Sequence, residues 1–143
     1  MPASFTASKS IVVEVPPGRV WEALTTPEVV KQYMFGAEVR SDWKVGSPLI
    51  YKGEWEGRPY EDRGTILAID PPRRLQATYY SPLSGQPDQP DSYQTVTYDL
   101  STPAEGQTRL TVTQSNNPSQ ESADQAANNW AMTLARIKEL LEA

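Results

Sequence analysis

The sequence predicts an α+β fold in which a curved antiparallel sheet of seven strands wraps around one long C-terminal helix. Three observations support this prediction. Between residues 35 and 114, apolar and polar side chains alternate with a period of two, which is typical of half-buried strands. Prolines and glycines separate these segments at short intervals. Residues 119–143 contain neither proline nor glycine and repeat apolar side chains at helical spacing.

A strand followed by two short helices is predicted before the remaining strands. The strand covers residues 9–15 and carries its apolar side chains on one face. Two prolines end it and suit the first turn of a helix over residues 19–25. Thr26 is predicted to cap a second short helix, which begins at Pro27.

Six further strands are predicted in the middle of the chain. They cover residues 37–42, 48–55, 63–69, 74–80, 93–100 and 108–114. The segment "IDPPRRL" is predicted to turn the chain between two of these strands. The proline-rich segment 81–92 is predicted to be a long, exposed loop. Short strands in succession imply an antiparallel sheet.

The C-terminal segment predicts one helix of about six turns, capped by Asn117 or Ser119. Its apolar stripe consists of Ala123, Ala127, Trp130, Leu134, Ile137 and Leu141. The first half of the stripe is made of alanines and the second half of large side chains. Two interpretations stay open: the alanines leave a cavity beside the short helices, or they let the helix approach the sheet closely.

Length, composition and charge restrict the class of protein. A chain of 143 residues favours a single domain over residues 1–143. Hydrophobic residues make up 38% and charged residues 22%, so we expect a folded globular protein. The formal net charge of −5 argues against a nucleic-acid partner, because binding phosphates needs clustered lysines and arginines.

The sequence contains no cysteine and no histidine. Without cysteine there is no disulfide, no thiolate nucleophile and no Cys-ligated zinc. Without histidine, the commonest general base and the commonest transition-metal ligand are missing. We therefore expect no metal and no cofactor, and any catalysis would depend on Asp, Glu, Lys, Tyr or Arg.

The sequence also bears on where the protein works. We expect no signal peptide, because the N-terminal stretch has neither a basic start nor a long apolar run. No apolar stretch approaches the ~20 residues that span a bilayer. A chain without cysteine fits a reducing compartment. These observations predict a cytoplasmic protein with no membrane span.

The alternation of strand residues predicts that several aromatic and apolar side chains point toward the interior of the sheet. These side chains are candidates for the wall of a ligand cavity. A buried tyrosine hydroxyl needs a hydrogen-bond partner, and several together suit an amphipathic small molecule. The predicted ligand-binding residues are Tyr33, Met34, Tyr51, Trp55, Ile66, Tyr79, Tyr98, Ala123, Ala127, Trp130 and Leu134. For each tyrosine the alternative is a core position whose hydroxyl reaches solvent at the rim.

Five motifs follow one another along the chain. They are "VPPGRVWEALTTPEVVKQY", "VRSDWKVGSPLIY", "GTILAIDPPRRLQATYY", "VTYDL" and "TRLTVTQSN", followed by a helix with a tryptophan. Over about residues 9–141 they resemble the START-like (SRPBCC, helix-grip) superfamily. More narrowly, they are similar to the branch named for the activator of the heat-shock-protein-90 ATPase, at its C-terminal domain.

The resemblance implies a helix-grip fold, with a seven-stranded antiparallel sheet gripping the C-terminal helix and two short helices between strands 1 and 2. It also implies a cavity often used for lipids, hormones or polyketide-like molecules. The matching positions look architectural and supply no catalytic set. They are Val20, Trp21, Leu24, Thr25, Asp42, Trp43, Gly46, Pro71, Pro72, Leu75 and Trp130.

The function predicted from the sequence is binding of a small apolar or amphipathic molecule. One alternative is a cyclase- or dehydratase-like enzyme, for which Glu54, Asp62, Arg63 and Asp99 are candidates by position alone. Catalysis is not favoured and no catalytic residue is assigned, because a run such as "EDR" is usually a solvated strand end. The other alternative is a chaperone-interacting module that resembles the heat-shock-protein-90 activator.

Overall fold

The computed structural model describes residues 5–34, 36–82 and 87–143, apart from the side chain of Trp55. Its strands are β1 (Phe5–Val13), β2 (Glu38–Ser41), β3 (Pro48–Trp55), β4 (Arg58–Asp70), β5 (Arg74–Tyr79), β6 (Gln94–Ser101) and β7 (Thr108–Asn117). Its helices are α1 (Pro17–Thr25), α2 (Pro27–Tyr33) and α3 (Gln120–Glu142), with a 3₁₀ turn η2 (Pro90–Ser92) before β6.

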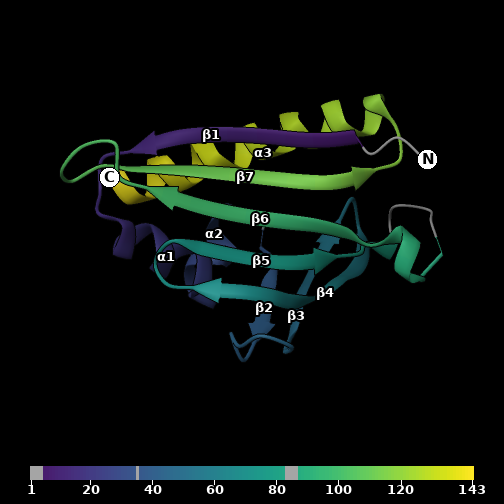
Figure 1. The fold of residues 1–143 in the computed structure, drawn as a ribbon. Helices are drawn as coiled ribbons and strands as arrows, with labels where there is room; N and C mark the ends of the chain where they lie inside the picture. Colours follow the sequence, from purple (N-terminus) through teal and green to yellow (C-terminus); the bar gives the residue numbers. More distant parts are fainter. Residues whose placement is uncertain (1–4, 35, 83–86) are drawn as a thin grey trace.

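The seven strands form one antiparallel sheet in the order β1-β7-β6-β5-β4-β3-β2. Figure 1 shows α3 running behind β1 and β7, with α1 and α2 behind the sheet below it. The helix α1 contacts β7 and α3, and α2 contacts β2 at the far edge of the sheet. This arrangement confirms the predicted α+β helix-grip fold, including the two short helices between the first and second strands.

Two strands begin earlier than the sequence pattern predicted. β1 begins at Phe5 and ends at Val13, because it pairs with β7 along nearly its whole length. β4 begins at Arg58 rather than at residue 63, because a tight turn pairs Arg58 with Trp55 and β4 then follows β3 residue by residue. Asp62 therefore lies inside a strand and not at its end.

The long helix is capped at its first turn and attached to the sheet near its last turn. Ser119 caps its first turn, where the Ser119 hydroxyl accepts a hydrogen bond from the amide of Ser122 at 3.0 Å. Near the last turn, the Lys138 ammonium donates to the backbone oxygen of Val12 at 2.8 Å. Between these ends, Leu134 and Ile137 are each 1% exposed. The helix is therefore held along the β1 side of the sheet.

Candidate functional site

A pocket of about 680 Å³ lies between α3 and the inner face of β3 to β6. Its volume falls within the range of small-molecule sites, about 300–1,000 Å³. The pocket exists because α3 packs against β1 and β7, at one edge of the sheet (Figure 1). The strands beyond β7 curve away, and their inner face is only partly covered.

The wall of the pocket is mainly apolar. Met34, Ala37, Leu49, Leu75, Ala77 and Val96 contribute to it. Trp130 on α3 meets the ring of Tyr98 on β6 edge to face, with 5.8 Å between the ring centroids and 87° between the ring planes. Aromatic rings favour this geometry because their positive edges meet their negative faces. This aromatic pair joins the helix side of the pocket to the sheet side.

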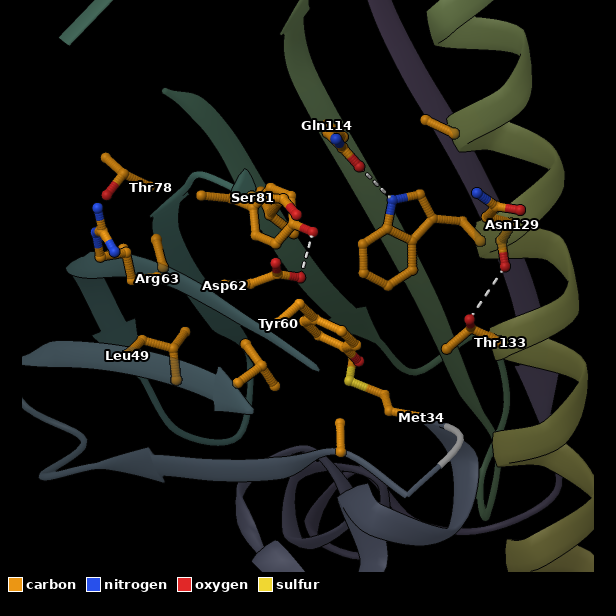
Figure 2. A pocket seen from close by; sticks show the side chains of 18 of the residues that line it. Met34, Leu49, Tyr60, Asp62, Arg63, Thr78, Ser81, Gln114, Asn129 and Thr133 are labelled. Carbon is orange, nitrogen blue, oxygen red and sulfur yellow. Dashed lines mark hydrogen bonds between the residues drawn. The ribbon is translucent and has the colours of Figure 1, made fainter. Parts of the chain in front are cut away.

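A carboxyl group forms the polar part of the wall. Asp62 on β4 is 9% exposed and lines the pocket. Figure 2 shows it between Tyr60 and Ser81, in the middle of the drawn side chains. The Tyr79 hydroxyl donates a hydrogen bond to Asp62 Oδ2 at 2.7 Å. Within the described part of the chain, the buried atom Asp62 Oδ1 has no hydrogen-bond partner.

The environment of Asp62 stabilises the neutral form of its carboxyl group more than water does for an ordinary aspartate. Burial raises the pKa of Asp62, because desolvation disfavours the charged carboxylate. Hydrogen bonding with Ser81 and Tyr79 lowers the pKa, but these effects are smaller than that of burial. The pocket therefore contains a carboxyl group that is less easily ionised than one in water.

A chain of side-chain amides holds Trp130 in place. The indole Nε1 of Trp130 donates to Gln114 Oε1 at 2.7 Å, a bond drawn in Figure 2. Gln114 Nε2 then donates to Gln94 Oε1 at 2.6 Å, and Gln94 Nε2 donates to Asn117 Oδ1 at 2.8 Å. Each amide both accepts and donates, so the direction of the whole chain is defined. The chain anchors the helix-borne indole to β6 and β7.

Tyrosine hydroxyls near the pocket are neutral groups rather than bases. Burial raises the pKa of Tyr33, Tyr51 and Tyr98, so all three stay protonated at neutral pH. The Tyr33 hydroxyl donates to the backbone oxygen of Ala23 at 2.9 Å. Interaction between the Tyr51 and Tyr98 hydroxyls lowers the pKa of Tyr51 and raises that of Tyr98, and for both residues this effect is smaller than that of burial.

Charged and aromatic side chains tie the proline-rich loop to the pocket. Arg63, which lines the pocket, forms an ion pair with Asp88 in the loop. Asp88 Oδ1 also accepts a hydrogen bond from the Tyr93 hydroxyl at 2.7 Å, and both partners lower the pKa of Asp88. The Arg63 guanidinium lies 5.4 Å from the ring of Tyr80, which stacks on Tyr93. Residues 87–91 of the predicted loop are exposed, and residues 83–86 lie outside the described residues.

The structure separates the predicted ligand-binding residues into two groups. Met34, Tyr51, Tyr79, Tyr98 and Trp130 line the pocket. Tyr33, Ile66, Ala123 and Leu134 are at most 2% exposed and belong to the packed interior, and Ala127 lies on α3 outside the pocket wall. Trp55 ends β3, and its side chain lies outside the described residues.

The alanines in the first half of α3 were predicted either to leave a cavity or to let the helix approach the sheet closely, and different alanines fit each interpretation. Ala123 is buried where α3 packs on the sheet, which fits a close approach of helix and strands. Ala126 lines the pocket, which fits a cavity beside the first half of the helix.

The four charged candidates occupy different environments. Asp62 and Arg63 line the pocket, whereas Glu54 is exposed on β3 and Asp99 lies 3.8 Å from Arg74 at a half-exposed position. The interpretation of the "EDR" run as a solvated strand end is wrong for Asp62. The signal that would have found it is its position four residues before Ile66, on the same face of a longer β4.

The described residues contain neither a cluster of metal-ligating side chains nor a helix that could span a membrane. Residues 5–34, 36–82 and 87–143 contain no group of three acidic side chains placed to hold a metal ion. None of the helices in this part of the chain is long and apolar enough to span a bilayer.

The curved sheet, its gripped helix and the pocket between them define a helix-grip protein. The chain belongs to the family described as Activator of Hsp90 ATPase homolog 1-like protein, whose sequence model matches residues 14–142. No curated protein sequence matches the chain.

Solved structures share the fold of this chain. A Cytophaga hutchinsonii protein with a solution structure is 42% identical, with a TM-score of 0.82 over 96% of this chain and 93% of that one. An HSP90 activator from Plasmodium falciparum is 21% identical, with a TM-score of 0.76 over 96% of each chain. DynU16, a putative protein in the dynemicin biosynthetic locus, is 21% identical, with a TM-score of 0.79 over 96% of this chain and 47% of that one.

Replacing Asp62 by asparagine is expected to stabilise the protein at pH 7.5 by about 1 kcal/mol, because the neutral amide keeps an oxygen that accepts from Tyr79 and removes the buried charge. The pKa of Asp62 is raised above its ordinary value of 3.8. Below that value the carboxyl group is protonated in both the folded and unfolded states, and the gain disappears. As the pH rises through the pKa that Asp62 has in the folded protein, the wild-type protein becomes less stable, because a charge must then be buried. The difference in unfolding free energy between Asp62→Asn and the wild type grows over the same range.

Urea unfolding of both proteins between pH 4 and pH 8 checks this prediction. Glu61→Gln is the matched control, because Glu61 is the preceding residue and its side chain is 43% exposed beside Lys52. The control is expected to change stability little at any pH. A gain for Asp62→Asn that is constant with pH, or largest at pH 4, would contradict the physical account.

Proposed function

We propose that the protein binds a small, mostly apolar molecule that carries a polar group. The observation that supports this proposal is the pocket of about 680 Å³, with an apolar wall and one buried carboxyl group. Such a combination of apolar surface and a few placed polar groups is typical of small-molecule sites. A cytoplasmic location is part of the proposal and fits the absence of cysteine.

The environment of the pocket favours binding over chemistry. Its buried tyrosines are held protonated, so they are poor bases. A cyclase- or dehydratase-like activity is the second candidate, because Asp62 and Tyr79 form a hydrogen-bonded pair of proton-carrying groups in the pocket. That activity would make Asp62→Asn inactive on a substrate that the variant still binds.

An NMR titration of the ¹⁵N-labelled protein with naphthalen-2-ylmethanol tests the binding proposal. This probe has an apolar ring system and one hydroxyl group. We expect saturable shifts of the Trp130 indole N–H signal and of amides in β4, β5 and α3 that line the pocket. Exposed residues of α3 away from the pocket, such as Glu139, serve as the internal control. The proposal fails if these signals do not move at a probe concentration of about 1 mM. A Kd of that size corresponds to a binding free energy of about −4 kcal/mol.

A chaperone-interacting role is a further candidate, favoured by the family description and by the fold shared with an HSP90 activator from Plasmodium falciparum. Exposed apolar side chains, including Val45 at 66%, Leu67 at 45% and Met132 at 56%, are available for contact. Calorimetric titration into the purified chaperone Hsp90 tests this role. Absence of heat at micromolar concentrations would argue against it.

A further inference from the structure

Two hydrogen-bond donors in the pocket wall have partners within the protein, whereas one buried acceptor has none. Among the donors, the Trp130 indole N–H is used by Gln114, and the Tyr79 hydroxyl is used by Asp62. Among the acceptors, Asp62 Oδ1 is buried and has no partner in the described part of the chain. A buried acceptor without a partner is costly, and a ligand that supplies a donor removes that cost.

Asp62 is placed so that a ligand in the pocket can reach its carboxyl group. Asp62 lines the pocket, and Figure 2 shows its carboxyl group on the sheet side, with Asn129 and Thr133 on the helix side. The Tyr79 hydroxyl donates to Oδ2, and hydrogen bonding with Ser81 also reaches the carboxyl group, whereas Oδ1 has no partner in the described residues. The torsion about the Cβ–Cγ bond of aspartate is broad, so a small rotation can turn the other oxygen toward a ligand.

The remaining charges of the pocket do not offset the acidic character of Asp62. Arg63 is already paired with Asp88 and lies over the ring of Tyr80. Glu56 in the β3–β4 turn and Arg58 at the start of β4 are exposed and have opposite signs. Exposed charges interact weakly in water, so their contribution to selecting a ligand is small.

We propose that the pocket selects molecules that carry a hydrogen-bond donor, a hydroxyl or a protonated amine, on an apolar body, with Asp62 as the acceptor. Carboxylate ligands are disfavoured, because they bring a second acceptor and a like charge to Asp62. This inference rests on the proposed binding function and adds the chemical class of the ligand.

Four probes with one ring system test the selection. They are naphthalene molecules that carry, at position 2, a hydroxymethyl group, an aminomethyl group, a methyl group or a carboxylate. Calorimetric titration of the wild-type protein at pH 7.5 is expected to rank the hydroxymethyl and aminomethyl probes about tenfold tighter than the methyl probe. The carboxylate probe is expected to bind at least about tenfold more weakly than the hydroxymethyl probe.

Asp62→Asn tests whether Asp62 is responsible for this order. In this variant we expect the aminomethyl probe to lose about tenfold in affinity and the carboxylate probe to gain affinity, because the like charge is gone. Glu61→Gln makes the same chemical change at the exposed preceding residue and is expected to keep the wild-type order. The ¹⁵N spectrum checks that each variant is folded.

Three outcomes overturn the inference and leave the proposed binding function intact. In the first, the wild-type protein binds the carboxylate probe as tightly as the hydroxymethyl probe. In the second, Asp62→Asn is folded and keeps the wild-type order. In the third, all four probes shift the pocket signals with equal affinity. If no probe shifts the pocket signals, the binding function and the inference fail together. If Asp62→Asn does not fold, the wild-type ranking alone decides.

Discussion

Replacing Gly64 by alanine is expected to lower the free energy of unfolding by about 3 kcal/mol, at the upper end of the usual cost of overpacking. Gly64 lies on β4 where the ladder with β5 is interrupted, and the amide of Thr65 donates to the side-chain oxygen of Thr78 at 2.8 Å. A Cβ atom at Gly64 would overlap the backbone oxygen of Thr78. Because that atom belongs to a strand backbone, it cannot move without shifting β5.

Gly18→Ala is the matched control for this change. Gly18 lies in the first turn of α1, and a Cβ atom there would meet nothing within 4 Å. Alanine is the better helix former, so this variant is expected to be as stable as the wild type or up to about 1 kcal/mol more stable. Urea unfolding followed by tryptophan fluorescence measures both. A Gly64→Ala protein within about 0.5 kcal/mol of the wild type would show that β5 accommodates the methyl group.

Replacing Ala126 by phenylalanine is expected to weaken binding of naphthalen-2-ylmethanol about 100-fold, a loss of about 2.7 kcal/mol. Ala126 lies on α3 and lines the pocket, and its methyl group leaves the neighbouring volume open. A phenyl ring at this position fills space that the probe needs. Folding stability is expected to change by less than about 1.5 kcal/mol, because the ring enters an open pocket and not a packed core.

Ala131→Phe provides the control for Ala126→Phe. Ala131 lies five residues further along the same helix and is exposed, so the substitution adds the same ring outside the pocket. It is expected to leave the affinity for the probe unchanged. Calorimetric titration of the three proteins measures the effect. Equal affinities for the wild type and Ala126→Phe would place the probe elsewhere on the protein.

Several elements of the fold could be predicted because their signals are local. The period of two over residues 74–80 and 93–100 predicted β5 and β6, since alternate side chains of a strand face opposite sides of the sheet. The helical stripe predicted α3, and Ser119, one of the two predicted cap residues, caps its first turn. The "IDPPRRL" turn was predicted from its prolines and connects β4 to β5.

The polar part of the pocket could not be predicted in the same way. Asp62 stands in a charged run, and its burial depends on β4 beginning at Arg58, which in turn depends on pairing with β3. The role of Gln114 depends on Trp130 of α3 lying against β7, sixteen residues away in the chain. These are contacts between elements, and no local pattern specifies them.

Local side-chain chemistry was sufficient for the strands, the helices and the antiparallel fold class, because periodicity and turn residues act over a few neighbours. The position of α3 on β1 and β7, and the pocket that this position leaves over the other strands, came from packing across the chain. The same packing places the buried carboxyl group of Asp62 in the pocket wall, because a residue's solvent exposure is a property of the assembled fold and not of its neighbours in sequence.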